Sequence, residues 1–122
     1  AWSEKSVLET LDQPNTICLI AEKAGRMAGY ILVYTAADEA EIARIAVAEE
    51  LKRQGVASSL MKELLLKCRE QGIEKVLLDV RESNAAARAF YGKTGFREDG
   101  IRQHFYEDPQ EDGILMSFAV GK

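Results

Sequence analysis

Short apolar runs separated by polar turns predict strands along the first third of the chain. One run covers residues 16–22 and a second covers residues 29–35, and both contain β-branched side chains. A glycine-containing turn at 24–26 lies between them, so together they predict a β-hairpin. Ahead of this hairpin, Ser3 is suited to cap a short helix over residues 4–11.

The period of the apolar pattern changes in the middle of the chain. A third strand is expected over residues 41–47, where the run is apolar and β-branched. Beyond it, apolar residues recur every four positions, at Val56, Leu60, Leu64 and Cys68. This spacing predicts an amphipathic helix that runs to about Glu70 and ends at Gly72, because glycine commonly follows the last turn of a helix.

The last third of the chain contains one more strand and helix and then two closing strands. A buried strand is expected over residues 76–80. It is followed by a helix that Ser83 or Asn84 caps and that ends near Gly95. The closing strands are expected at residues 96–105 and 114–120. This order of elements indicates a single α+β or mixed α/β domain with three layers.

The composition is that of a globular protein with one core. The chain has 122 residues, of which 47% are hydrophobic and 30% are charged, and its formal net charge is −4. It has no apolar run near the roughly 20 residues that span a membrane, and its acidic balance does not favour nucleic acid as a partner. Two isolated cysteines and one histidine supply neither a disulfide framework nor a metal site. We therefore expect a reduced, cytoplasmic protein that binds no membrane, nucleic acid or metal.

A basic loop with one glycine joins the third strand to the long helix. Gly55 lies where the backbone comes close to another group, and Lys52 and Arg53 add positive charge beside it. Free N–H groups at a helix start, together with the helix dipole, form an anion site suited to a phosphate or pyrophosphate. An ordinary glycine-containing turn is the alternative. The chain has neither a Walker A motif nor G-x-G-x-x-G, so neither a P-loop nor a dinucleotide-binding fold is indicated.

Two segments, in this order, resemble the hallmarks of the GNAT superfamily of N-acetyltransferases. Lys-Arg-Gln-Gly-Val-Ala at residues 52–57 resembles its acetyl-CoA loop, with lysine at a position that is usually glutamine or arginine. Residues 84–96 resemble its second motif, in which an asparagine, an alanine, a tyrosine and a Gly-Phe pair stand at fixed spacing. The resemblance covers essentially the whole chain and is stronger to the branch of bacterial ribosomal-protein-alanine N-acetyltransferases.

The resemblance implies a particular arrangement of the sheet. It would be mostly antiparallel, in a GNAT-type three-layer fold, with one central pair of parallel strands that splay apart. The parted strands would be those ending at Val47 and Val80. The superfamily's first strand and first helix would precede Ala1. Because the chain also begins without an initiator methionine, we expect this N-terminal segment to be missing from the sequence.

The resemblance also implies acetyl-CoA as a co-substrate. Its pantetheine would enter between the parted strands and pair with the backbone of residues 45–47, and loop N–H groups would hold its pyrophosphate. The residues expected to bind it are Ile45, Ala46, Val47, Lys52, Arg53, Gln54, Gly55, Val56, Ala57, Ser58 and Asn84. Asn84 would reach the thioester region, although its spacing also suits a helix cap.

Three residues are expected to carry the chemistry, and a fourth to contact the acceptor. Tyr91 would protonate the departing thiolate, although a tyrosine on an apolar helix face is often only part of a core. Asp79 stands where the related branch has glutamate, and we expect it to act as general base through a water, because aspartate is one methylene shorter. Glu41 is the alternative base, since its strand resembles the one with the catalytic glutamate in the histone-type branch. Tyr106 would pack over the first residue of the acceptor.

We therefore expect acetyl transfer to the N-terminal α-amine of a protein, with a ribosomal protein as the acceptor and direct attack by the amine. An α-amine has a pKa of about 8 and a lysine amine about 10.4, so a weak, water-linked base suits the α-amine better. Acetylation of a lysine or small polyamine is one alternative, and a non-catalytic CoA-binding sensor is another. The apolar edge strands are compatible with a monomer or a weak homodimer.

Overall fold

The computed structural model describes residues 7–9 and 13–121. Within these ranges, seven strands form one sheet in the spatial order β1-β2-β3-β4-β5-β7-β6. The strands are β1 (Val7–Glu9), β2 (Thr16–Lys23), β3 (Arg26–Ala36), β4 (Glu39–Val47), β5 (Lys75–Arg81), β6 (Arg97–Tyr106) and β7 (Glu111–Ala119). The helices are α1 (Val56–Glu70) and α2 (Ala85–Thr94), with a short 3₁₀ turn at Glu49–Leu51.

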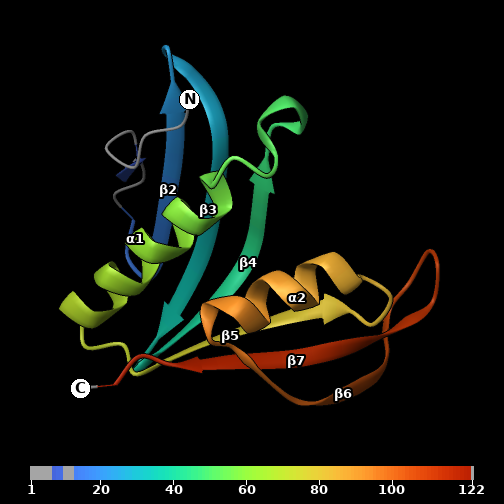
Figure 1. The fold of residues 1–122 in the computed structure, drawn as a ribbon. Coiled ribbons are helices and arrows are strands. Elements are labelled where there is room, and N and C mark those ends of the chain that lie inside the picture. Colours follow the sequence, from blue (N-terminus) through green and yellow to red (C-terminus); the bar gives the residue numbers. More distant parts are fainter. Residues whose placement is uncertain (1–6, 10–12, 122) are drawn as a thin grey trace.

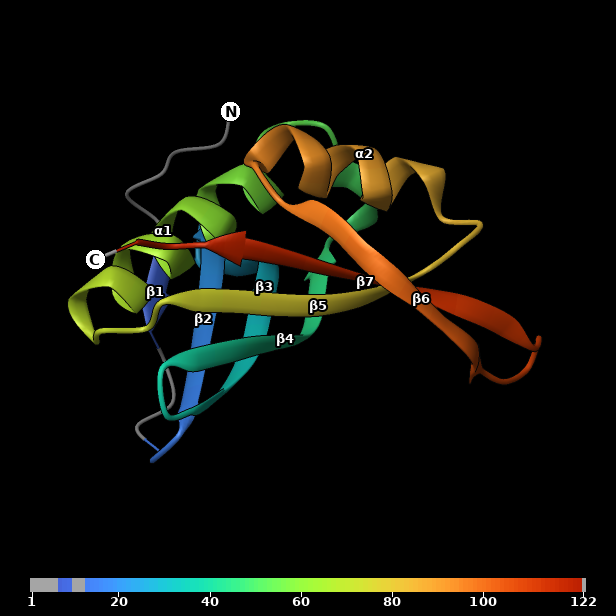
Figure 2. The ribbon, with the colours of Figure 1, turned by 90° about the horizontal axis from the view of Figure 1, so that it is seen from below.

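Both helices lie on the same side of the sheet, in front of it in Figure 1 and above it in Figure 2. Neighbouring strands run antiparallel except for the central pair β4 and β5, which run parallel. The core lies between the sheet and the helices, and its fully buried members include Leu19, Ile31, Leu60, Leu64 and Val76. The prediction of a mixed α/β fold with a mostly antiparallel sheet and one parallel pair is therefore confirmed. The described residues form two layers, the sheet and one layer of helices, and the third predicted layer is not among them.

The central parallel pair is short. β4 and β5 are paired only from Glu39 opposite Lys75 to Glu41 opposite Leu77. Beyond this point β4 continues along β3 and β5 continues along β7, so the two strands diverge, as Figure 1 shows. A register shift between Leu32 and Val33 in the β3–β4 ladder lies close to the same level of the sheet. The backbone of residues 42–47 therefore has no strand partner among the described residues on the side that faces β5.

Helix α1 follows the predicted apolar stripe. Val56, Leu60, Leu64 and Cys68 are each at most 1% exposed, and the helix packs on β2, β3 and β4. Gly55 precedes the helix with φ of 91°, a left-handed conformation that glycine adopts without steric cost. The prediction of a helix from Val56 to about Glu70 is confirmed in type and in both boundaries.

Helix α2 is held by a cap at each end. The side-chain oxygen of Asn84 accepts a hydrogen bond from the backbone N–H of Ala87 (3.1 Å), as expected for an N-cap. Gly95, with φ of 119°, ends the helix and packs so closely on Phe118 that a Cβ atom would lie 2.8 Å from its ring. An aromatic cluster joins the helix to the sheet, with 5.6 Å between the ring centroids of Tyr91 and Phe96.

The predicted helix over residues 4–11 is wrong in its described part. Val7–Glu9 forms β1, which pairs antiparallel with β2. The physical reason is that β2 would otherwise present an unpaired edge, and the backbone hydrogen bonds of that edge outweigh the weak helix signal of so short a segment. Ser3 and the other residues of this prediction lie outside the described residues.

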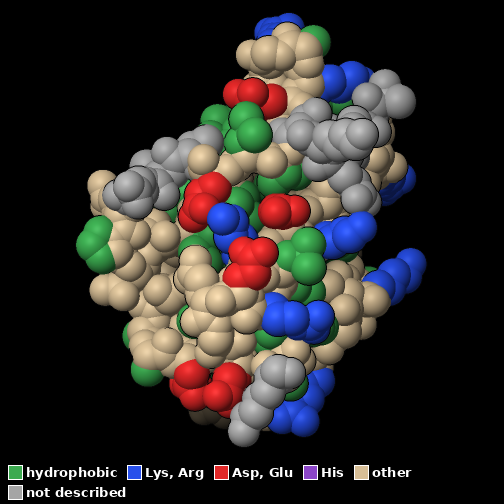
Figure 3. Space-filling model, turned by 90° about the vertical axis from the view of Figure 1, so that its left-hand side faces the viewer, with side chains coloured by type: hydrophobic (Ala, Val, Ile, Leu, Met, Phe, Trp, Pro, Cys, Tyr) green, Lys and Arg blue, Asp and Glu red, His purple; other side chains and the backbone are tan. Residues whose placement is uncertain are grey.

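The described surface is mixed in charge. On the face shown in Figure 3, acidic and basic side chains lie among one another, and no large field of one sign covers it. Among the ion pairs of the described residues, one joins Lys67 of α1 to Glu9 of β1, with 2.6 Å between Nζ and Oε1. Within the described ranges, neither helix has the length and apolar composition needed to cross a membrane. The same ranges contain no group of three or more His, Cys, Asp or Glu residues arranged to hold a metal ion.

Gly29 is expected to be intolerant of a side chain. A Cβ atom there would lie 2.7 Å from the carbonyl oxygen of Ala46 and 3.1 Å from Val56. We expect Gly29→Ala to lower the free energy of unfolding by about 1–3 kcal/mol, because β3 and β4 would have to separate. Urea unfolding measures this change. Gly92→Ala is the control, because a Cβ atom there meets no atom within 4 Å, and equal destabilisation by both substitutions would contradict the prediction.

Candidate functional site

A groove of about 670 Å³ opens where β4 and β5 have parted. Its walls come from the end of β4, the loop before α1, the first turn of α1 and one face of α2. The lining residues are Ile45, Ala46, Val47, Leu51, Lys52, Arg53, Gly55, Val56, Ala57, Ser58, Ala86, Ala87, Phe90 and Tyr91. A mostly apolar groove with a basic, glycine-containing loop among its walls suits a ligand that has an apolar part and a phosphate group.

The loop end of the groove has the chemistry of an anion site. The first helical hydrogen bond of α1 runs from the N–H of Ser59 to the carbonyl of Gly55, and no side chain caps the helix. The N–H groups of residues 56–58 therefore have no acceptor within the helix, and they lie at the positive end of its dipole. Arg53 lines the groove beside them, and Lys52, whose Nζ lies 3.1 Å from Glu49 Oε1, adds a second cation.

Most of the residues predicted to bind a cofactor line this one groove. The two that do not are Gln54 and Asn84. The side-chain amide of Gln54 instead donates a hydrogen bond to the carbonyl of Glu50 (3.3 Å), and Asn84 caps α2. The cap that the spacing of Asn84 also allowed is therefore present, and its predicted contact with the thioester region stays a prediction.

Several lining residues were missed in the sequence. Ala86, Ala87 and Phe90 form part of the α2 wall, and Leu51 lies directly before the basic loop. A signal for one of them was available, because Ala87 stands four positions before the predicted site residue Tyr91. Residues four apart lie on the same face of a helix, so the wall could have been extended back from Tyr91.

Tyr91 is part of the α2 wall of the groove. It is 7% exposed, and its ring packs against Phe90 (5.4 Å between centroids) and Phe96 (5.6 Å). Burial raises the pKa of its phenol, and interaction with Tyr106 raises this pKa further. The phenol therefore keeps its proton at neutral pH and is in the right state to donate it to a leaving group.

Asp79 lies on β5, beyond the last pair with β4, and does not line the groove itself. Its side chain is 11% exposed, and Nε of Arg102 lies 2.9 Å from its Oδ1. This contact is an ion pair only, because Oδ1 is buried and accepts no hydrogen bond of good geometry. The oxygen therefore retains the capacity to accept a hydrogen bond from a water or a ligand.

Tyr106 connects the two catalytic candidates. Burial raises the pKa of its phenol, and the negative charge of Asp79 raises it further, while the Arg81 guanidinium lowers it. Because Tyr106 in turn raises the pKa of Tyr91, it interacts electrostatically with both Asp79 and Tyr91. Glu41 differs: it is exposed, lies at the last β4–β5 pair opposite Leu77, and does not line the groove.

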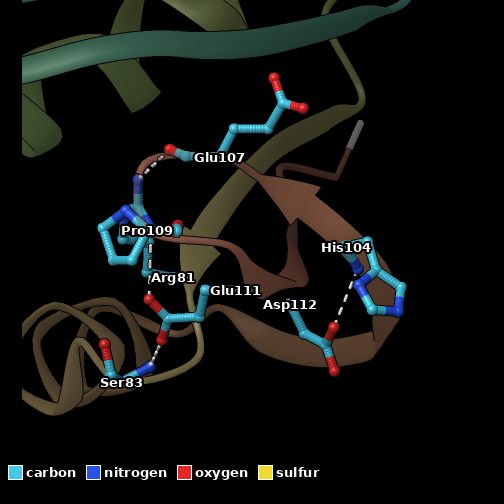
Figure 4. Close-up of polar contacts among 7 residues, drawn as sticks. All are labelled: Arg81, Ser83, His104, Glu107, Pro109, Glu111 and Asp112. Carbon is cyan, nitrogen blue, oxygen red and sulfur yellow. Dashed lines mark hydrogen bonds and ion pairs between the residues drawn. The ribbon is translucent and has the colours of Figure 1, made fainter.

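Figure 4 shows the hairpin turn that follows Tyr106. Arg81 and Glu111 join the turn to the end of β5, on the side where Ser83 lies. His104 lies away from them, where its backbone N–H donates to Asp112 Oδ1 (2.9 Å). The histidine is thus part of the hairpin rather than of the groove. Arg81 was missed as a candidate in the sequence.

The chain is similar in sequence to known acetyltransferases. Residues 1–96 match the model of the Acetyltransferase (GNAT) family. Over 121 residues the chain is 33% identical to the ribosomal protein bS18-alanine N-acetyltransferase of Escherichia coli, a match that covers 98% of this chain and 81% of that protein.

The fold is likewise similar to solved structures. A crystal structure of the ribosomal-protein-alanine N-acetyltransferase from Escherichia coli has a TM-score of 0.85 at 32% identity, and the match covers 91% of this chain and 73% of that one. A GNAT family acetyltransferase from Elizabethkingia anophelis, solved with acetyl-CoA bound, has a TM-score of 0.80 at 26% identity, covering 86% and 76%.

Gly55 offers a test of the anion site. At φ of 91° an alanine is strained by about 1–2 kcal/mol, and relief of that strain would turn the N–H groups of residues 56–58. We expect Gly55→Ala to weaken binding of coenzyme A, the ligand that the sequence resemblance implies, by about tenfold. Isothermal titration calorimetry measures this affinity.

The matched control is Gly25→Ala in the turn between β2 and β3. Gly25 has φ of 76° and open space around it, so the substitution introduces similar strain away from the groove. It should lower stability and leave the affinity for coenzyme A unchanged. Equal affinities in the two variants would show that Gly55 has no part in an anion site.

Proposed function

The chain belongs to the GNAT family of acetyltransferases and is an acetyl-CoA-dependent N-acetyltransferase, and on this premise we propose that it acetylates the N-terminal α-amine of a protein. The observation that carries the proposal is that one groove is lined by the basic loop and uncapped start of α1 and also by the buried Tyr91 of α2. With Asp79 of β5 as the base, a phenol in that groove suits transfer between a bound thioester and an amine. The proposed acetyltransferase domain spans residues 1–122.

In this proposal, backbone groups that line the groove bind acetyl-CoA as much as side chains do. The free backbone edge of residues 45–47 would pair with the amide groups of pantetheine, as a neighbouring strand would. The N–H groups of residues 56–58 would hold the pyrophosphate, with Arg53 and Lys52 nearby. The residues present fit this ligand, because the amide-bearing arm and the anionic group each meet complementary chemistry.

When bound, acetyl-CoA supplies a thioester whose acetyl group passes to the amine with release of the thiol. Asp79 accepts, through a water, the proton that the amine loses as its nitrogen bonds to the carbonyl carbon. Tyr91 donates its proton to the sulfur as the carbon–sulfur bond breaks. No acyl-enzyme is needed, and burial argues against one at Cys68, because it raises the pKa of this thiol to about 11.

The indirect reach expected of Asp79 favours an α-amine over a lysine as the acceptor. An α-amine has a pKa of about 8, so about a tenth of it is already neutral at pH 7, whereas a lysine amine near 10.4 is almost wholly charged. Asp79 would reach the amine only through water, and its carboxylate already pairs with the Arg102 guanidinium, so it suits an amine that is partly neutral without its help. The similarity to the bS18-alanine N-acetyltransferase of Escherichia coli supports a ribosomal protein as the acceptor.

The proposal predicts which peptides are acetylated. One pool has free Ala, Ser or Thr N-termini and no lysine, and a second pool has blocked N-termini and free lysines. We expect thiol release and a 42 Da gain, the mass of one acetyl group, only with the first pool. Mass spectrometry of the products identifies the acetylated nitrogen. Acetylation confined to the lysine pool would overturn the α-amine assignment.

The same assay tests the roles of the side chains. Asp79→Asn and Tyr91→Phe are each expected to lower kcat by about 100-fold, because each loses one proton transfer, while the KM for acetyl-CoA stays close to that of the wild type. Glu41→Gln is the matched control on the neighbouring strand and should change kcat by less than about threefold. A large loss with Glu41→Gln and a small one with Asp79→Asn would instead identify Glu41 as the base.

A further inference from the structure

Arg81 stands at a junction that the proposed mechanism does not use. It is the last residue of β5, two positions after Asp79, so the two side chains lie on the same face of the strand. Its partner on the neighbouring strand β7 is Gly113, which has no side chain to cover it. The side chains of Arg81 and Asp79 are therefore neighbours on one face of β5, and Arg81 is the nearer of the two to the turn of the β6–β7 hairpin.

The Arg81 guanidinium fixes the turn of that hairpin. It donates hydrogen bonds to the carbonyl of Pro109 (2.9 Å), to the carbonyl of Glu107 (3.2 Å) and to Glu111 Oε1 (3.3 Å). These contacts converge in Figure 4, where the turn wraps around the arginine. One planar group therefore sets the conformation of the whole segment 107–111, because its donors have a fixed fork geometry.

The same guanidinium also holds Tyr106. Its Cζ lies 4.5 Å from the centroid of the Tyr106 ring, within the range of a cation–π interaction. Tyr106 is the last residue of β6 and directly precedes the turn. The ring is therefore fixed from both sides, by its strand and by Arg81.

Glu111 extends this junction to helix α2. Its second carboxylate oxygen accepts a hydrogen bond from the backbone N–H of Ser83, the residue before the α2 cap Asn84. The Ser83 contact and, less strongly, Arg81 lower the pKa of the Glu111 carboxyl, so it stays ionised at neutral pH. The turn, the end of β5 and the start of the helix that carries Tyr91 are thus joined through one ion pair.

A second line of contacts leads from Tyr106 back to Asp79. The Tyr106 ring meets Phe105 edge to face, with 5.0 Å between centroids. Phe105 lies over Gly113, where a Cβ atom would be 3.1 Å from its ring. The Arg102 guanidinium lies 5.4 Å from the Phe105 centroid and pairs with Asp79. Arg102, Phe105 and Tyr106 of β6 therefore form one connected set of side chains, and Arg102 joins this set to the Asp79 carboxylate.

We propose that Arg81 is a positioning residue for the acceptor, which holds the turn 107–111 and the Tyr106 ring as a preformed wall beside Asp79. The inference rests on the proposed function, because it takes Asp79 as the base at which the amine arrives. A preformed wall lowers the ordering cost of acceptor binding, so Arg81 acts on the acceptor and not on acetyl-CoA. Arg81 touches neither the groove lining nor the reacting atoms.

The chain offers a closely matched control in Arg88. Its side chain is 32% exposed, as is that of Arg81, and it also makes three hydrogen bonds: two to Glu98 and one to the carbonyl of Glu82. It too joins β6 to the β5–α2 region, but it does not contact the 107–111 turn. Substitution of Arg88 therefore removes a similar number of hydrogen bonds and should lower stability to a similar extent, without affecting the 107–111 turn.

The experiment compares Arg81→Met, Arg81→Lys and Arg88→Met in steady-state kinetics, with thermal unfolding to verify folding. We expect Arg81→Met to raise the KM for the acceptor by about tenfold and to leave the KM for acetyl-CoA within about twofold. Arg81→Lys keeps the charge without the fork and should recover only part of the loss. Arg88→Met should leave both KM values unchanged. Equal effects of Arg81→Met on both substrates, or equal acceptor effects of Arg81→Met and Arg88→Met, would overturn the inference.

A double-mutant cycle separates a positioning role from a merely structural one. If Arg81 acts through Tyr106, the losses in acceptor kcat/KM from Arg81→Met and Tyr106→Ala will not add, whereas those from Arg88→Met and Tyr106→Ala will. Additive losses in the first pair would overturn the inference. All variants are measured with the peptide pool that the wild type acetylates. If the wild type acetylates only the lysine pool, the α-amine assignment is wrong. The role of Arg81 is decided separately, by how its variants change the KM and kcat/KM for the acceptor.

Discussion

The parallel pairing of β4 with β5 stops after three residue pairs. The free edge of β4, and the groove beside it, exist because the pairing ends there. If the pairing continued, the backbone groups of residues 42–47 would be used within the sheet. Because each strand instead follows its antiparallel neighbour, one edge of β4 is left without a protein partner among the described residues. The groove between the strands, the basic loop and the start of α1 all lie around that edge.

The site combines a part made of residues close together in the sequence with a part made of residues far apart in it. The groove comes from a continuous segment, the end of β4 to the first turn of α1, together with one face of α2. The proposed acceptor side comes from β5 and the β6–β7 hairpin, whose contacts join residues about thirty positions apart, as between Arg81 and Glu111. The contact of Glu111 with Ser83, directly before α2, joins this side to the helix that lines the groove.

The elements that sequence reasoning predicted well are those with local signals. The stripe of α1 and the glycines at its ends determined its position, and Asn84 and Gly95 did the same for α2. The groove residues followed from the family motif together with the strand–loop–helix order. β1 was predicted wrongly, because three residues show no period and their conformation is decided by the open edge of β2.

Arg81, Arg102 and Glu111 could not be found in the same way. Their contacts depend on the register of β6 against β7, which shifts twice, between Glu98 and Gly100 and between Arg102 and Tyr106. Each shift changes which residues lie opposite one another, and no local pattern in the sequence marks it. The alternation of side chains along β5 does place Arg81 on the same face as Asp79. The contacts of Arg81, however, are determined by the conformation of the turn at 107–111.

The edge position of β6 has a consequence for how such an enzyme diversifies. Residues 97–105 are exposed along their whole length, and only β7 pairs with this strand. Substitutions at most of these positions remove little from the core and leave the groove lining untouched, so they are nearly neutral for stability; Arg102, which pairs with Asp79, and Phe105, which packs over Gly113, are exceptions. If the proposed acceptor side is correct, a gene duplicate can drift toward a new acceptor through its last quarter while its use of the acetyl donor is inherited unchanged.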